Sequence, residues 1–249
     1  MMFYRRACAV FLGILFACVL RAEEMSPAMR SLCQRAESAA FIPRHAPRPS
    51  ADPLFRALAT SDDETILSQA LGGTDPNALR GTMGMTALSF AVASGNVKGA
   101  RLLLARGAQI DLKDRHDGLP FEFALTSGRP GMACLLVQWG AKVPSERDVP
   151  FLLPMAAVSK DDPEGATIMV DFLANHGHDI NARVMGDTAL LIAAETGNLP
   201  LVRLLLKRGA DINAVNKQHE NAEAIARRSG NLEIAKLVRQ WRSVKGEGR

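Results

Sequence analysis

His176, His178 and Asp179 are the most compact set of side chains in the sequence that could bind a metal ion. Two imidazoles and a carboxylate so close together have the ligand chemistry of a zinc site. The repeat register described below, however, places His176 at the end of a helix and His178 in the loop that follows. We therefore expect a solvated loop here and predict no metal site.

The other candidates for chemistry lack partners in the sequence. Ser159-Lys160 and Asp161-Asp162 offer a nucleophile and acidic groups, but no positioned base completes a catalytic frame around them. The sequence also contains no Gly-rich phosphate loop, paired-carboxylate frame or dinucleotide fingerprint. We predict a non-enzymatic protein that carries no cofactor.

Two of the four cysteines, Cys8 and Cys18, lie in an apolar N-terminal segment, which leaves Cys33 and Cys134 in the remaining chain. These two could form a disulfide in an oxidising compartment. Sequence provides no geometry for such a bridge. We expect two unpaired thiols and keep the disulfide as the alternative.

The N-terminus has the features of an export signal. Arg5 and Arg6 precede an uninterrupted apolar run of 14 residues from Ala7 to Leu20. A membrane-spanning helix needs about 20 apolar residues, so this run is too short to span comfortably. A cleavage motif, Leu20-Arg21-Ala22, follows. We predict a signal peptide over residues 1–22 and export to the periplasm.

A second interpretation of the same segment stays open. Leu15-Phe16-Ala17-Cys18 resembles a bacterial lipoprotein box, in which the chain is cut before the cysteine and the thiol is acylated. The alternatives to a free periplasmic protein are therefore a lipoprotein anchored through Cys18 and a secreted protein. We expect membrane contact only through the signal segment or this anchor.

The charge balance argues against nucleic acid as a partner. The formal net charge is +4, but without Arg5, Arg6 and Arg21 the chain has 27 basic and 26 acidic residues. A charge near neutrality lacks the basic footprint of a nucleic-acid-binding protein. The mixed charges favour a protein as the partner.

A repeated unit of 33 to 34 residues accounts for most of the chain. Thr86 and Thr188, which are 102 residues apart, each precede a short apolar helix pattern, and a glycine follows nine residues after each threonine. A second apolar pattern comes next and ends at another glycine, as at Gly107 and Gly209. One such helix pair cannot bury its own apolar faces, whereas several stacked pairs can.

This pattern resembles the ankyrin repeat. The best matches are residues 84–88 with 107–111, and Thr188-Ala189-Leu190 with residues 209–214, whereas residues 74–77 and 176–181 are weaker copies. The histidine of the family motif is absent, and the residues in its place are Ser89, Glu122, Leu191 and Ala224.

The resemblance implies an all-α ankyrin-repeat solenoid of about six helix-turn-helix repeats with short hairpin-like loops. We expect the repeats at residues 51–80, 81–113, 114–146, 147–182, 183–215 and 216–242. We expect an N-terminal helix and a Pro-rich linker over residues 23–50, with Ser26 capping the helix, and a polar tail over residues 243–249.

The resemblance also implies a concave binding surface made of hairpin tips and the inner ends of first helices. We predict a monomer that holds a protein partner there, as a periplasmic adaptor, inhibitor or immunity-type protein. The alternative is a secreted or surface-anchored effector that binds host proteins. The predicted partner-binding residues are Lys113, Arg115, His116, Ser94, Thr126, Ser127, Arg183, Met185, Glu195, Thr196, Lys217, Gln218 and Arg228.

Overall fold

The structure is a computed structural model that describes residues 25–41, 52–79 and 84–246. The predicted signal peptide, the lipoprotein box at Cys18 and most of the Pro-rich linker lie outside the described residues. Within these ranges the regular secondary structure is helical apart from one two-stranded hairpin and an isolated bridge between Val215 and Asn221, which confirms the all-α repeat fold. The chain divides into two compact units, one ending at Val143 and the other beginning at Pro144.

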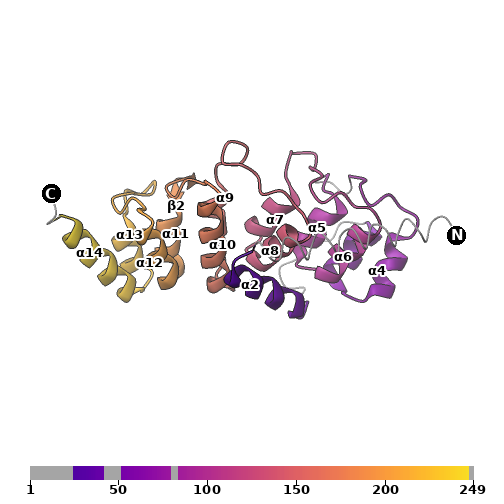
Figure 1. Cartoon of the computed structure of the whole chain (residues 1–249), viewed down its shortest axis with the longest axis horizontal. Coiled ribbons are helices and arrows are strands. Elements are labelled where there is room, and N and C mark those ends of the chain that lie inside the picture. The colour runs from indigo at the N-terminus through magenta and orange to yellow at the C-terminus, as the bar shows by residue number, and fades with distance from the viewer. Residues whose placement is uncertain (1–24, 42–51, 80–83, 247–249) are drawn as a thin grey trace. The chain divides into compact units, whose positions relative to one another are not determined.

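The described residues of the first unit form three helix pairs and one additional N-terminal helix (Figure 1). The first helices of the pairs pack side by side, α3 on α5 and α5 on α7, and the second helices α4 and α6 pack together in the same way. The helices are α2 (Pro27–Ser38), α3 (Pro53–Thr60), α4 (Glu64–Leu71), α5 (Ala87–Ser94), α6 (Val97–Ala105), α7 (Pro120–Thr126) and α8 (Pro130–Gln138).

The described residues of the second unit form three further helix pairs and a hairpin. Helix α11 packs between α9 and α13, while α12 contacts α10 and α14. The first of these helices, α9, has five residues, and a proline, Pro154, lies inside it. The elements are α9 (Leu152–Ala156), α10 (Pro163–Asn175), β1 (Arg183–Val184), β2 (Asp187–Thr188), α11 (Ala189–Thr196), α12 (Leu199–Lys207), α13 (Ala222–Arg228) and α14 (Leu232–Gly246).

Threonine caps and glycine ends define the repeats as the sequence indicates. The Thr86 hydroxyl accepts a hydrogen bond from the Ser89 amide at 3.0 Å and donates one to the Ser89 hydroxyl at 2.9 Å. Ser89, which stands in place of the family's histidine, is therefore satisfied inside the same turn. Gly95 ends α5 in the left-handed region with φ of 73°, which glycine adopts without steric cost.

Asparagines that follow these glycines connect neighbouring repeats. The Asn96 amide donates to the Leu58 carbonyl at 3.0 Å and to the Ser61 carbonyl at 2.6 Å, while its oxygen caps α6 by accepting from the Gly99 amide. Asn198 donates to the Pro163 carbonyl at 2.7 Å in the same way. The recurrence of Gly-Asn in register was visible in the sequence, but its role in joining repeats was not predicted.

Replacing Asn96 with alanine is expected to lower the free energy of unfolding by about 2 kcal/mol. The side chain is fully buried, and its loss leaves two carbonyls and one helix amide without their partner. Urea unfolding of the variant measures the effect. An exposed capping residue, Asp63, provides the control, because water can replace its hydrogen bonds. Equal losses for Asn96→Ala and Asp63→Ala would contradict the inter-repeat role.

Helix α2 is part of the first unit and not a free segment ahead of it. Ser26 caps the helix as predicted, accepting from the Met29 amide. Cys33 of α2 and Cys134 of α8 form a disulfide with their Cα atoms 5.4 Å apart, so the expectation of two unpaired thiols is wrong. Helix α8 explains why: almost all of its residues are buried, so it needs cover on its outer side, and α2 packs there (Figure 1).

Further contacts hold α2 in place. Gly131 allows α2 to approach α8 closely, because a Cβ at this position would lie only 2.7 Å from the Ala36 Cβ. The Arg101 guanidinium of α6 pairs with the Glu37 carboxylate of α2 and lies 5.6 Å from the centre of the Trp139 ring. The disulfide therefore links two helices that also pack against each other, and the Arg101–Glu37 pair connects α2 to α6 as well.

The C-terminal helix pair has an ion-pair network centred on Glu223. The carboxylate is approached by the guanidinium groups of Arg227 at 2.7 Å, Arg239 at 3.0 Å and Arg242 at 3.6 Å. Although burial acts to raise it, hydrogen bonds from Arg227 and Arg239 hold the pKa of Glu223 below its usual value.

Replacing Glu223 with glutamine is expected to remove part of the acid sensitivity of the fold. A carboxyl group whose folded pKa is lowered stabilises the fold above its unfolded pKa, and this contribution is lost as pH falls through the folded value. The wild-type protein should therefore lose stability below about pH 4.5, and Glu223→Gln should lose less over the same window. Thermal unfolding at pH 7 and in acid measures the difference. Parallel pH profiles for the two proteins would contradict the network.

Candidate functional site

The hairpin that opens α11 presents a large apolar side chain to solvent. Val184 pairs with Asp187 in an antiparallel register, and Met185-Gly186 form the two-residue turn. Both turn residues have positive φ, 55° and 107°, the backbone of a tight hairpin turn that asparagine and glycine prefer. Met185 is nevertheless at the tip and is 86% exposed. An apolar side chain in a costly backbone conformation is a feature typical of functional surfaces.

Side chains from two loops hold this tip in place. The Arg183 guanidinium donates to the Gly186 carbonyl at 2.6 Å and to the Val215 carbonyl at 2.8 Å, which joins the hairpin to the next loop. The Lys217 side chain lies over Gly186, because a Cβ added at Gly186 would be only 2.9 Å from the Lys217 Cγ. We call Arg183, Met185, Val215 and Lys217 the hairpin surface: two exposed apolar side chains flanked by two cations.

The loop after Val215 is also ordered by its own hydrogen bonds. The Asn216 side-chain oxygen accepts from the Gln218 amide at 3.0 Å and from the Glu220 amide at 2.9 Å. Gln218, one of the residues predicted to contact a partner, is exposed and follows Lys217 of the hairpin surface. Val215 is 37% exposed and belongs to the same loop tip to which the repeat register assigns Lys217 and Gln218.

The inner helix ends of the second unit contribute one exposed carboxylate and two groups with internal partners. Glu195 is exposed at the end of α11. The Thr196 hydroxyl donates to the Ile192 carbonyl at 3.0 Å, and the Arg228 guanidinium pairs with Glu220 at 3.0 Å. Burial, together with the charge of Glu195, raises the pKa of Asp187 above its usual value.

The first unit contains a second loop tip of the predicted kind. The Asp114 carboxylate accepts from the amides of His116 and Gly118, both at 2.8 Å, and this fixes the turn. The exposed residues at this tip are Lys113, Arg115, His116 and Asp117, and the Lys113 ammonium lies 3.7 Å from the Asp117 carboxylate. The end of α7 adds Thr126, which is exposed, and Ser127, which is half-buried.

Ser94 does not belong to any accessible surface. It is fully buried, and its hydroxyl has no hydrogen-bond partner among the described residues. Helix α5 is buried along its whole length, and the Arg129 side chain covers its end by donating to the Ala93 carbonyl at 2.9 Å. The prediction that Ser94 contacts a partner is therefore wrong, because a residue of the next repeat covers this helix end.

The histidines of the candidate metal set are occupied by protein contacts. His178 is buried instead of solvated: its Nδ1 lies 2.8 Å from the Glu146 carboxylate, and its Nε2 lies 3.0 Å from the Pro144 carbonyl. The His176 Nδ1 contacts the Phe172 carbonyl at 2.8 Å. His178 therefore fastens the loop before α9 to the end of α10.

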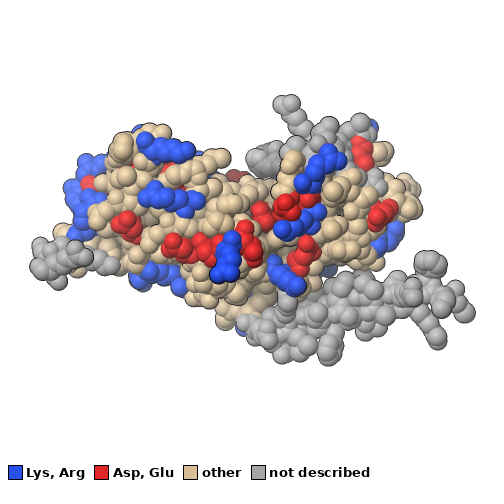
Figure 2. All heavy atoms as spheres, turned by 90° about the horizontal axis from the view of Figure 1, so that it is seen from above, with Lys and Arg blue, Asp and Glu red and all other residues tan. Residues whose placement is uncertain are grey.

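Neither a metal centre nor a membrane helix is present in the part of the chain that the structure describes. No group of three or more His, Cys, Asp or Glu residues in these ranges is arranged to hold a metal ion. None of the described helices combines the length and apolar character needed to cross a bilayer. On the face shown in Figure 2, Lys and Arg are interspersed with Asp and Glu over most of the surface.

The comparisons with known proteins agree with this architecture. Two ranges of the chain, residues 54–147 and 155–243, match a family model described as ankyrin repeats (3 copies). The chain belongs to the ankyrin repeat family, whose repeats form protein–protein interaction modules.

Curated relatives match most of this chain but only a small part of their own length. Ankyrin repeat protein nuc-2 of Neurospora crassa is 30% identical over 155 residues, which are 61% of this chain and 14% of the relative. The B-cell lymphoma 3 protein homolog of Mus musculus is 30% identical over 165 residues, which are 66% of this chain and 29% of the relative. The chain thus spans less than a third of the length of either relative.

A solved structure is similar over a larger share of both chains. It is a chain from the complex of a predatory endopeptidase from Bdellovibrio bacteriovorus with an immunity protein. The TM-score is 0.58 at 26% identity, and the similarity covers 77% of this chain and 98% of that chain.

Proposed function

We propose that this protein is an exported, non-catalytic binding module that holds a protein partner on its loop tips and inner helix ends, as an inhibitor or immunity-type protein. The exposed Met185 in a fixed hairpin tip is the observation that carries the proposal. An exposed apolar side chain flanked by cations matches the composition of the central part of protein interfaces, which is apolar within a polar rim.

The rigidity of these loops in the free protein favours binding. The hairpin surface and the Asp114 turn are both fixed by hydrogen bonds within the free protein. Loops that are already arranged lose little conformational entropy when a partner binds, so more of the contact energy appears as affinity.

Two independent features support export. Arg5 and Arg6 with the following apolar run have the pattern of a signal peptide. The Cys33–Cys134 disulfide belongs to the chain after that segment, and disulfides persist mainly in oxidising compartments. The similarity to a chain of the endopeptidase–immunity protein complex favours an inhibitor or immunity-type protein over a general adaptor.

Site-specific photocrosslinking in the native host tests the binding surface. A benzoylphenylalanine residue at Gln218, beside the hairpin surface, should crosslink to one protein of defined mass. The same probe at Arg203, which is exposed on α12, is the matched control and should give no such product. A crosslink of equal yield at both positions, or at Arg203 alone, would contradict the proposed surface.

A further inference from the structure

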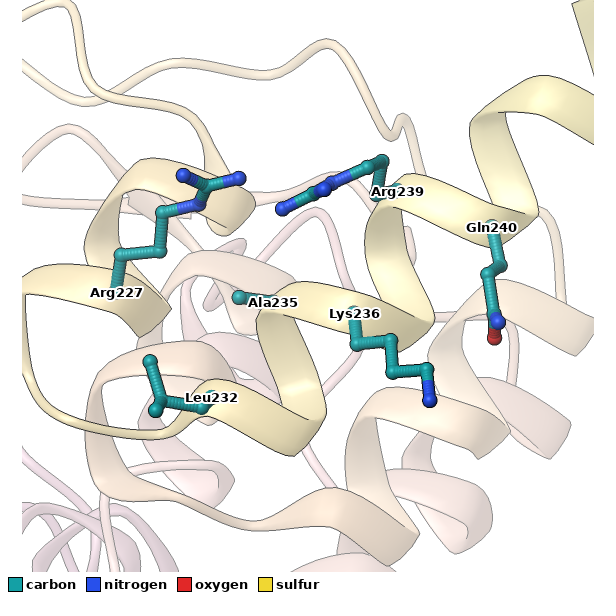
Figure 3. A pocket seen from close by; sticks show the side chains of 6 residues that line it. All are labelled: Arg227, Leu232, Ala235, Lys236, Arg239 and Gln240. Atoms are coloured by element: carbon teal, nitrogen blue, oxygen red, sulfur yellow. The ribbon is translucent and has the colours of Figure 1, made fainter.

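The C-terminal helix pair has a hollow on its surface that the proposed function does not use. Its volume is about 670 Å³, and α13 and α14 provide its walls (Figure 3). We call it the C-terminal hollow, and it is lined by Arg227, Leu232, Ala235, Lys236, Arg239 and Gln240.

The hollow has an apolar floor and a cationic rim. Leu232, at the start of α14, is 68% exposed, although most large apolar side chains of the unit are buried. In Figure 3 the guanidinium groups of Arg227 and Arg239 point toward each other on one side, and Lys236 and Gln240 extend from α14 on the other. An apolar side chain could therefore lie on Leu232 and Ala235 while its neighbours meet positive charge.

The positive charge of the rim is in excess of the carboxylates nearby. Among the described residues, the Glu223 carboxylate pairs with Arg227, Arg239 and Arg242, so one negative charge opposes three positive ones. Lys236 has no ion-pair partner within the described ranges. The carboxylate of Glu233, on α14, lies 3.9 Å from Arg203 of α12. The rim thus retains net positive charge after its internal pairs are formed.

A role as a polar cap does not account for this arrangement. A terminal repeat needs a polar outer face for solubility, and mixed charges serve that need. Here one sign is in excess, and an exposed leucine lies among the cations. In the view of Figure 2, Lys and Arg also gather over the C-terminal helices. Excess positive charge around an apolar floor is complementary to a ligand with carboxylates on either side of an apolar group.

We propose that the C-terminal hollow binds an acidic segment of a protein partner. A large apolar side chain of that segment lies over Leu232 and Ala235, and its flanking carboxylates pair with Arg239 and Lys236. Arginine presents a planar fork of donors that suits carboxylates. The inference rests on the proposed function in one respect, that the ligand is a protein. It adds a second contact surface and the chemistry of what this surface recognises.

Fluorescence anisotropy with three labelled peptides tests the proposal. The first alternates Asp and Glu around a central Leu, the second has Ser in place of that Leu, and the third has Asn and Gln in place of the acidic residues. The full-length mature protein should bind the first peptide at least about tenfold more tightly than either of the others, with affinity falling as salt rises.

Charge reversals provide the matched variants. Lys236→Glu should weaken binding of the first peptide by about tenfold or more, whereas Lys207→Glu, the same change on the exposed part of α12, should leave it within about twofold. Leu232→Ser should weaken binding and remove the preference for Leu over Ser. Neither Lys236 nor Leu232 supports the fold, so unchanged thermal unfolding is the folding control.

The proposal would be overturned if Lys207→Glu and Lys236→Glu weakened binding equally. It would also be overturned if the peptides with central Leu and central Ser bound with equal affinity, because either result indicates non-specific charge attraction. The Gln218 crosslink reports on a different surface. If the crosslink is absent while the first peptide still binds, the proposed function alone is rejected. If the first peptide does not bind while the crosslink still forms, only the proposed role of the C-terminal hollow is rejected.

Discussion

Replacing both Cys33 and Cys134 with alanine is expected to lower the free energy of unfolding by about 3 to 5 kcal/mol. The disulfide closes a loop of 101 residues, and a crosslink over so long a loop removes much of the conformational entropy of the unfolded chain. The effect should concentrate in the first unit, because α2 and α8 both belong to it.

Urea unfolding of the protein with and without a reductant measures this effect. Reductant should destabilise the wild-type protein and leave the double variant unchanged, which separates loss of the bridge from loss of side-chain packing. Limited proteolysis should also cleave the variant more readily between α2 and α3. Equal stability of the wild-type protein in oxidised and reduced form would show that the bridge contributes nothing.

Replacing Met185 with asparagine is expected to weaken partner binding by about 10- to 100-fold without destabilising the fold. Truncation of a central interface residue costs about 2 kcal/mol or more, which corresponds to this range. Asparagine adopts positive φ more readily than methionine, so the hairpin turn should be retained while the apolar contact is lost.

The affinity for the protein captured through Gln218 measures the effect, and Met185→Leu is the matched control. Leucine keeps an apolar side chain at the tip and should retain most of the affinity, while thermal unfolding confirms that both variants are folded. Unchanged affinity of Met185→Asn would exclude the hairpin tip from the interface.

The helix pairs could be predicted because their signals are local. Thr86 and Thr188 cap the helices that follow them, and glycines end helices where the backbone must enter the left-handed region. Each of these features depends on a few neighbouring residues, so a single repeat in the sequence contains the information.

The errors arise where distant residues decide the outcome. Ser94 is polar and near a helix end, yet Arg129 of the next repeat covers that end. The pairing of Cys33 with Cys134 depends on the packing of α2 against α8 across 101 residues. A sequence signal existed for the latter, because α8 has apolar residues on all sides and therefore needs a covering element.

The sequence assigned individual residues of the candidate binding site to loop tips, but it did not predict the contacts that fix these loops. Arg183, Met185 and Lys217 were assigned to loop tips by repeat register alone. The two hydrogen bonds of Arg183, which connect adjacent loops and hold Met185 outward, depend on side-chain geometry. The convergence of three arginines on Glu223 also depends on side-chain geometry. The sequence indicated only that the terminal repeat is polar.

Quantitative capture from fractionated cells tests the central proposal most directly. The tagged protein is expressed in its native host, crosslinked, purified from the periplasmic, membrane and culture-supernatant fractions, and its partners are identified by mass spectrometry. We expect a periplasmic pool with one stoichiometric protein partner, which is lost on combining Arg115→Glu with Lys217→Glu. A pool confined to the supernatant or outer surface without a partner from the same cell would contradict it and favour an effector that binds host proteins.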